Sequence, residues 1–287
     1  MKKSGLFLLT ALIASCSKPA EIPHTIHYVV GNPYSVGTTW MYPEENFNYQ
    51  ATGLAMVSST QKGTITTDGE VYNPRTMTGG HQTLQLPSVV KVRNLDNGRE
   101  IVIRLNNREP STPTRILSLT PLAAEMLGIS KNGVAKVEII EDESQSRNIA
   151  LQLPNGPQLP ITAAPVGEVQ QQDLNNPSST KTLGGNDGSS TLKSVNKPIL
   201  LTDFPTTYVQ GTPRFSQIFI DGGSFTSKNY AYRLAAQMNG RLVSVVENNG
   251  RAVTHVRVGP FNSVSEADHA LENFLSSGIK GAKIVIE

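Results

Sequence analysis

The sequence predicts a mainly β domain that is joined through a linker to a smaller α+β domain. Between Thr52 and Glu141, short runs of alternating apolar and polar residues are separated by turn signals, which is the pattern of a compact β-barrel. Residues 142–213 are rich in Pro, Gly, Gln, Asn and Ser and lack apolar periodicity, which is typical of a disordered linker. In 214–287, strand and helix patterns follow the order βαββαβ of a ferredoxin-like sandwich.

Two strand patterns and a turn between them are the clearest elements of the first domain. Residues 89–94 and 100–105 alternate in polarity, and Asp96-Asn97-Gly98 joins them. Because Asn and Gly tolerate positive φ, this tripeptide predicts a tight turn. A short helix that Thr120 caps is predicted over 120–128, and a last strand over 133–141.

The C-terminal domain shows two amphipathic helices among four strand patterns. Residues 227–240 place apolar side chains at i, i+3, i+4 and i+7. The second helix opens at Ser263-Val264-Ser265-Glu266, which has the form of a capping box. Strands are predicted over 217–222, 241–247, 252–258 and 283–287.

Charge and cysteine content exclude several partners and chemistries. The formal net charge is +2, and removal of Lys2 and Lys3 with a signal peptide leaves +2 − 2, about zero. A near-neutral chain gives no electrostatic basis for binding nucleic acid. Cys16 is the only cysteine, and the histidines have no ligand-like spacing. We therefore expect no intramolecular disulfide, no metal and no other cofactor.

Residues 1–15 have the pattern of a lipoprotein signal peptide. Lys2 and Lys3 precede an apolar stretch that is too short to span a membrane stably. Ile13-Ala14-Ser15-Cys16 matches a bacterial lipobox, whose cysteine receives diacylglycerol and then an acyl chain such as palmitate. Since Ser17 rather than Asp follows, we expect an outer-membrane anchor facing the periplasm. The alternative is an ordinary signal peptide with an incidental cysteine.

Residues 16–51 are expected to form an N-terminal arm that lies on the barrel. The part from Pro23 to Gln50 is rich in Tyr, Pro and Asn and has little periodicity. We expect Trp40, Tyr42 and Phe47 to anchor this arm by packing against the barrel. Stacking of these aromatic rings on sugars is the alternative.

Polar side chains gather between Thr66 and Pro110. A turn carries Glu70, a Gly-Gly pair presents His81, and a strand ends in Asn106-Asn107-Arg108-Glu109. An imidazole, carboxylates, an arginine and amides are thus brought to the ends of a small sheet, which suits a polar polymer such as a glycan. Glu70 and His81 either touch that ligand or act as turn and capping residues. Arg108 either binds the glycan or anchors the structure.

Several motifs together carry a family resemblance. They are Thr52-Gly53-Leu54-Ala55, Thr67-x-Gly69-Glu70-x-Tyr72, His81-x-Thr83-Leu84-x-Leu86-Pro87-Ser88, Val92-x-Asn94-Leu95-x-Asn97-Gly98-Arg99 and Leu119-x-x-x-Ala123-Ala124-x-x-Leu127-Gly128. This set resembles the rare lipoprotein A family. The C-terminal domain resembles a sporulation-related (SPOR) repeat through Gly223-Ser224-Phe225 and Arg257-Val258-Gly259-Pro260-Phe261.

The resemblance implies a fold, an activity and partners. The fold is a six-stranded double-psi β-barrel, and the activity is endolytic peptidoglycan transglycosylase, a lyase reaction that leaves 1,6-anhydromuramyl ends. The SPOR domain is implied to bind glycan strands lacking stem peptides at the division septum, with Phe225, Arg257 and Phe261 as candidate binding residues. Proteins of the division machinery are further expected partners.

The sequence departs from the family at the catalytic position. The family's Asn-Asp-Arg-Gly-Pro stands here as Asn106-Asn107-Arg108-Glu109-Pro110, and a second family Asp is Ser118. Asn107 cannot donate a proton as an acid. His81 and Glu70 remain as catalytic candidates by resemblance, and Glu109 is a candidate substitute acid. Two hypotheses follow: a septal transglycosylase, or a catalytically silent glycan-binding lipoprotein.

Overall fold

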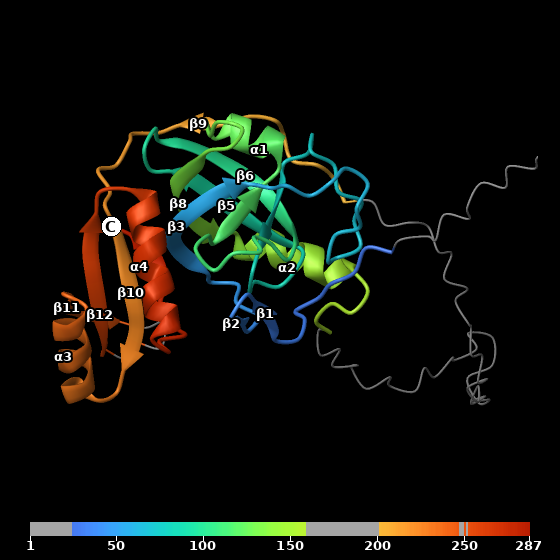
Figure 1. Ribbon diagram of the computed structural model, residues 1–287. Coiled ribbons are helices and arrows are strands. Elements are labelled where there is room, and N and C mark those ends of the chain that lie inside the picture. Colours follow the sequence, from blue (N-terminus) through green and yellow to red (C-terminus); the bar gives the residue numbers. More distant parts are fainter. Residues whose placement is uncertain (1–24, 159–200, 247–249, 251) are drawn as a thin grey trace, which may run out of the picture.

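The computed structural model describes residues 25–158, 201–246, 250 and 252–287 (Figure 1). The predicted signal peptide with Cys16 and the central part of the predicted linker, 159–200, lie outside these residues. Among the helices of the described ranges, none is long and apolar enough to cross a membrane.

The first domain is a closed barrel of six strands. These are β3 (Gln50–Val57), β4 (Thr78–His81), β5 (Ser88–Asn94), β6 (Arg99–Asn107), β7 (Leu117–Leu119) and β8 (Val134–Glu141). They pair in the order β4-β7-β3-β8-β5-β6, and β6 pairs again with β4, which closes the barrel. The pairings β3–β7 and β4–β6 are parallel and the others are antiparallel. The predicted six-stranded double-psi barrel is confirmed.

Alternation along β5 shows why the sequence folds this way. Val90 and Val92 are fully buried in the barrel core, whereas Lys91 between them is exposed. Each buried valine contributes about 1.5–3 kcal/mol relative to an exposed one. Helix α1 (Pro121–Met126) covers part of this core, and Thr120 caps it as predicted by accepting a hydrogen bond from the backbone N–H of Ala123.

The N-terminal arm includes a hairpin of β1 (Tyr34–Val36) and β2 (Thr39–Met41). Phe47 is buried as expected of an anchor, but Trp40 and Tyr42 are 51% and 65% exposed. The prediction that these two rings anchor the arm is therefore wrong. Alternation in β2 buries Thr39 and turns Trp40 outward.

Both described ends of the predicted disordered linker are ordered, which corrects that prediction. Helix α2 (Glu143–Gln152) packs on β5, where the Ser146 hydroxyl accepts a hydrogen bond from the backbone N–H of Val89. Residues 201–213 run along the barrel and include β9 (Val209–Gln210), which pairs with β6. Small and polar side chains make these contacts, so apolar periodicity did not reveal them.

The C-terminal domain is a four-stranded antiparallel sheet with two helices. Its elements are β10 (Ile218–Phe225), α3 (Lys228–Gln237), β11 (Arg241–Val246), β12 (Ala252–Phe261), α4 (Val264–Ser276) and β13 (Lys283–Ile286). The sheet order is β11-β12-β10-β13, which is the order of a ferredoxin-like sandwich and confirms the predicted fold class. Ser227 and Ser263 cap the two helices.

The two domains touch each other along β3 (Figure 1). The Thr52 hydroxyl donates to the carbonyl of Ile286 at 2.7 Å and accepts from its N–H at 3.0 Å. Leu54 and Leu95 of the barrel join an apolar cluster with residues of β10, α4 and β13. The C-terminal domain therefore rests directly on the barrel wall.

Candidate functional site

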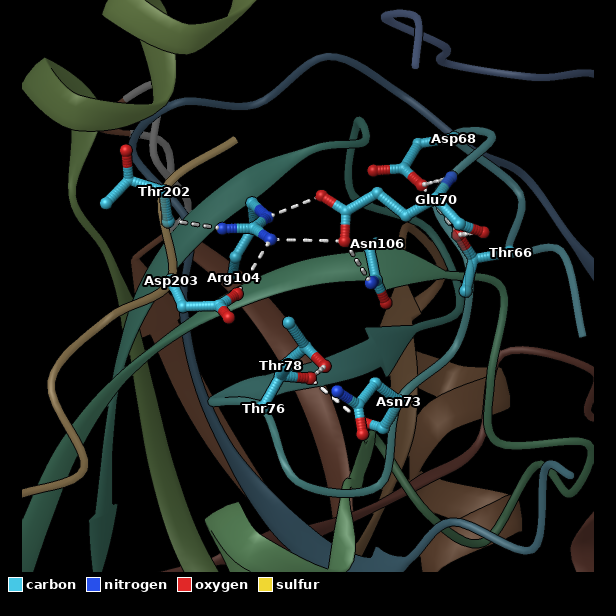
Figure 2. A network of polar contacts seen from close by, with 10 residues as sticks. All are labelled: Thr66, Asp68, Glu70, Asn73, Thr76, Thr78, Arg104, Asn106, Thr202 and Asp203. Carbon is cyan, nitrogen blue, oxygen red and sulfur yellow. Dashed lines mark hydrogen bonds and ion pairs between the residues drawn. The ribbon is translucent and has the colours of Figure 1, made fainter. Parts of the chain in front are cut away.

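Glu70 is held in a buried polar network (Figure 2). Its two carboxylate oxygens accept hydrogen bonds from Nε and Nη2 of Arg104 at 2.8 and 3.1 Å, and one also accepts from the Asn106 amide at 2.8 Å. Arg104 is 3% exposed and reaches the carbonyl of Thr202 at 2.9 Å and the carboxylate of Asp203 at 3.6 Å. Of its two sequence-based alternatives, Glu70 has the geometry of the structural one.

A second carboxylate, Asp68, lies beside Glu70 and was not predicted as a site residue. It is fully buried, and its Oδ1 accepts hydrogen bonds from the Thr66 hydroxyl at 2.7 Å and the Glu70 N–H at 3.1 Å. Its Oδ2 has no hydrogen-bond partner among the described residues. Burial, and then the charge of Glu70, raise the pKa of Asp68 to about 7.

We expect the folding stability to fall as the pH rises from about 4 to 7. In this interval the folded state binds more protons than the unfolded state, because the pKa of Asp68 is raised in the folded protein. Burial likewise raises the pKa of Glu141 to about 7, which acts in the same direction. Since one pKa unit corresponds to about 1.4 kcal/mol, the loss should reach a few kcal/mol.

Urea unfolding of the native chain and of Asp68→Asn at pH 5 and pH 8 measures this effect. The variant keeps an acceptor oxygen for Thr66 and removes the titrating group, so its stability should depend less on pH. Equal pH dependence in the two proteins would contradict the assignment to Asp68.

His81 is buried in the barrel wall with both ring nitrogens engaged. Its Nδ1 accepts hydrogen bonds from the N–H groups of Thr83 and Leu84, both at 3.1 Å, so Nε2 carries the proton and donates to the Tyr49 hydroxyl at 3.1 Å. Burial, and then the charge of Arg108, lower the pKa of His81 to about 3. A neutral and occupied imidazole positions the chain here, which argues against its predicted role as a catalytic or glycan-contacting group.

Arg108 joins the barrel to the N-terminal arm. Its guanidinium donates hydrogen bonds to the backbone carbonyls of Val30, His81 and Leu84. With its donors directed at three carbonyls, Arg108 has the geometry of a structural anchor and not of the predicted glycan ligand.

Asn107 ends β6 and is held by Thr67. Its Oδ1 accepts hydrogen bonds from the N–H and the hydroxyl of Thr67 at 3.2 and 2.9 Å. A carboxylate at this position would receive the same two hydrogen bonds. The two Thr67 donors would therefore also suit an aspartate at position 107.

Glu109 is the predicted site residue that lines an open cavity together with hydroxyl groups. Its Oε2 accepts hydrogen bonds from the hydroxyls of Ser58 and Ser118, both at 2.7 Å, and its Oε1 accepts from the hydroxyl of Thr60. The cavity has a volume of about 260 Å³. Its lining residues are Met56, Ser58, Ser59, Glu109, Pro110, Ser111, Thr112 and Ser118.

A second cavity of about 410 Å³ extends this one along the barrel. The two share Met56, Ser59 and Thr112, and the second continues to Arg115 and Lys131. We call the combined cavity the barrel groove. It has a carboxylate at one end, two cations at the other and hydroxyl groups between, which suits an extended polar ligand.

The three predicted glycan-binding residues of the C-terminal domain differ in their surroundings. Arg257 is buried and forms ion pairs with Asp221 at 3.1 Å and with Glu287, so its role is structural. Phe225 packs against the ring of Tyr230. Phe261 lines a cavity of about 560 Å³ between the ends of α3, β12 and α4, where a ligand can reach it.

Comparison with known proteins identifies the two domains. Residues 46–139 match the family model described as lytic transglycolase, and residues 218–285 match the SPOR domain. These two matches confirm the predicted domain composition, a lytic transglycolase domain followed by a SPOR domain.

Several similar proteins are named endolytic peptidoglycan transglycosylase RlpA. The protein of Yersinia pestis is 37% identical over 50% of this chain and 43% of its own length. That of Pseudomonas aeruginosa (strain UCBPP-PA14) is 27% identical over 85% of this chain and 73% of its own length. That of Vibrio cholerae is 31% identical over 48% of this chain and 63% of its own length. The match thus spans less than half of the Yersinia protein.

Family motifs and groove residues coincide only in part in this chain. The motif residues Glu70 and His81 are built into the barrel wall, whereas Ser58 and Ser118 line the groove. Within the described ranges, no three His, Cys, Asp or Glu side chains are grouped so that they could hold a metal ion.

Proposed function

We propose that this chain acts on the glycan strands of peptidoglycan in the manner of an endolytic transglycosylase. The strand lies in the barrel groove, and the SPOR domain binds the same polymer. The observation that carries this proposal is the groove beside Glu109, in a barrel of the lytic transglycolase family. Its hydroxyl and amide lining suits a polar sugar polymer.

The reaction includes two proton transfers, and in this proposal one carboxyl group serves both. A carboxylic acid protonates the leaving glycosidic oxygen as its bond to the anomeric carbon breaks, and the muramyl 6-hydroxyl then closes on that carbon and loses its own proton. Glu109 would give the first proton and take the second, so it ends in its initial state. The hydroxyls of Ser58 and Ser118 both donate to Oε2, so they hold the carboxyl group in place beside the groove. A carboxylate also favours an oxocarbenium-like transition state.

A second candidate is a glycan-binding protein without turnover. It is favoured by Asn107, which the sequence resemblance aligns with the family's acid and whose amide oxygen accepts two hydrogen bonds from Thr67. Two other motif residues, His81 and Glu70, lie in the barrel wall, where their side chains are hydrogen-bonded to other residues of the protein. An amide can bind a sugar hydroxyl but cannot protonate a leaving group.

The setting of the protein is a further part of the proposal. We propose a lipid anchor on Cys16 in the outer membrane, a periplasmic location enriched at the septum, and strands without stem peptides as the ligand. The SPOR match and the relatives named peptidoglycan transglycosylase support a cell-wall role. The domain limits 1–15, 16–51, 52–141 and 214–287 are likewise proposed, since the family models match only 46–139 and 218–285.

Digestion of purified strands tests the proposal. The chain from Ser17 onward is incubated with strands lacking stem peptides, and the products are identified by mass spectrometry. Products with 1,6-anhydro ends support the transglycosylase. Strand pull-down without products supports the silent binder. If the chain neither cleaves the strands nor pulls them down, both candidate functions are excluded.

A further inference from the structure

The barrel groove ends at an arginine that already holds a carboxylate. Arg115 lies just before β7 and lines the larger cavity of the groove. Its Nη1 and Nη2 donate to Oδ1 and Oδ2 of Asp268 at 2.7 and 2.9 Å. Asp268 belongs to α4, so this carboxylate comes from the C-terminal domain. The side chains are 11% and 26% exposed, so the pair is partly screened from water.

The geometry of this contact is that of ligand recognition. A planar guanidinium that makes two parallel hydrogen bonds is the preferred arrangement for binding a carboxylate group. The Arg115 Nη1 also donates to the carbonyl and hydroxyl of Thr114, which orients the fork. The core of α4 does not require Asp268, because this helix packs through Ala267, Leu271 and Phe274.

The ligand of the proposed function carries the matching group. When a stem peptide is removed from a muramyl residue, the lactyl amide becomes a free carboxylate. A strand without stem peptides therefore has one carboxylate in each disaccharide. Lys131, in the same cavity as Arg115, adds positive charge at this end of the groove.

We propose that Arg115 is a carboxylate-binding subsite of the groove and that Asp268 occupies it in this structure. A carboxylate-bearing glycan strand and the C-terminal domain then compete for the same arginine. This inference rests on the proposed function and adds to it the chemical group that the barrel recognises. Strand binding at Arg115 removes one of the contacts that hold α4 on the barrel, so it loosens the C-terminal domain.

The test measures strand affinity by fluorescence anisotropy with two labelled ligands. One has free lactyl carboxylates, and the other has the same carboxyl groups reduced to alcohols. Asp268→Asn should tighten binding of the carboxylate strand about tenfold, as expected for coupling between two sites. It should leave binding of the reduced strand unchanged. Glu272→Gln, an equal charge change on an exposed residue of the same helix, should have no effect on either strand.

Arg115→Met distinguishes a carboxylate-binding subsite from a contact that only joins the two domains, because it breaks the contact with Asp268 from the barrel side. The subsite predicts weaker binding of the carboxylate strand, and Asp268→Asn should add nothing in the Arg115→Met background. Arg115→Lys, which keeps the charge but loses the fork, should weaken binding less. The subsite would be overturned if Arg115→Met bound the carboxylate strand more tightly than the native chain. It would also be overturned if Asp268→Asn tightened binding of the reduced strand as much as that of the carboxylate strand. If both strands bind the native chain and no variant changes this, the subsite fails while the proposed function stands. If neither strand binds any of the proteins, both fail.

Discussion

Replacing Arg104 with methionine should lower the free energy of unfolding by about 3–5 kcal/mol at neutral pH. Arg104 is the buried cation beside Glu70 and Asp68, and it also holds the carbonyl of Thr202 (Figure 2). Its removal leaves the Glu70 charge in the barrel wall without a counterion. Methionine has a similar length and fills the space, so the loss reports the charge and the hydrogen bonds more than packing.

Urea unfolding monitored by circular dichroism measures this effect. Lys91→Met is the matched control, because it breaks an exposed ion pair with Glu100 and should change stability by at most about 0.5 kcal/mol. The Arg104→Met loss should shrink at acidic pH, because the raised pKa of Asp68 leaves that carboxyl neutral there. If Arg104→Met and Lys91→Met are equally stable at neutral pH, the network is not holding the barrel wall as described.

If the second candidate function holds and the native chain binds strands without cleaving them, Asn107→Asp should raise the rate of strand cleavage by about 100-fold or more, which is a typical effect of a positioned general acid. The site is prepared for this change, since Thr67 offers two donors that an aspartate accepts without rearrangement. Counting anhydro ends per unit time at saturating strand measures the rate.

Asn107→Ser is the control for this gain. It removes the amide without supplying an acid and should not increase the rate. An unchanged rate in Asn107→Asp, with the variant folded and strand binding intact, would mean that position 107 no longer faces the scissile bond.

Much of the fold could be predicted because strands, turns and helix caps depend on residues that are close together in the sequence. The alternation around Val90 and Val92, the turn at Gly98 and the Thr120 cap each depend on neighbouring residues, and all are present. Burial of polar residues was harder to foresee. Arg108 lies in a polar cluster at a strand end, where glycan binding and structural anchoring were both open, and its partners include Val30, which is 78 residues away. Only the folded chain shows that these carbonyls occupy its donors.

The groove was not predictable from the sequence for the same reason. Ser58 and Ser118 meet at Glu109 because β3 and β7 pair in parallel, and the sequence does not show that these residues are neighbours. Asp68 reads as an ordinary turn residue, although the fold buries it. The ordered ends of the predicted linker were missed because contacts such as that of Ser146 with Val89 leave no apolar periodicity.

The central claim is that the carboxylate in the barrel groove acts on a bound glycan strand. The most direct measurement is the rate at which the native chain and Glu109→Gln form 1,6-anhydro ends, with strand affinity determined in parallel. We expect anhydro ends from the native chain, a rate that is about 100-fold or more lower in Glu109→Gln, and unchanged affinity. Equal rates in the two proteins, or a native chain that binds strands and forms no anhydro ends, would contradict the claim.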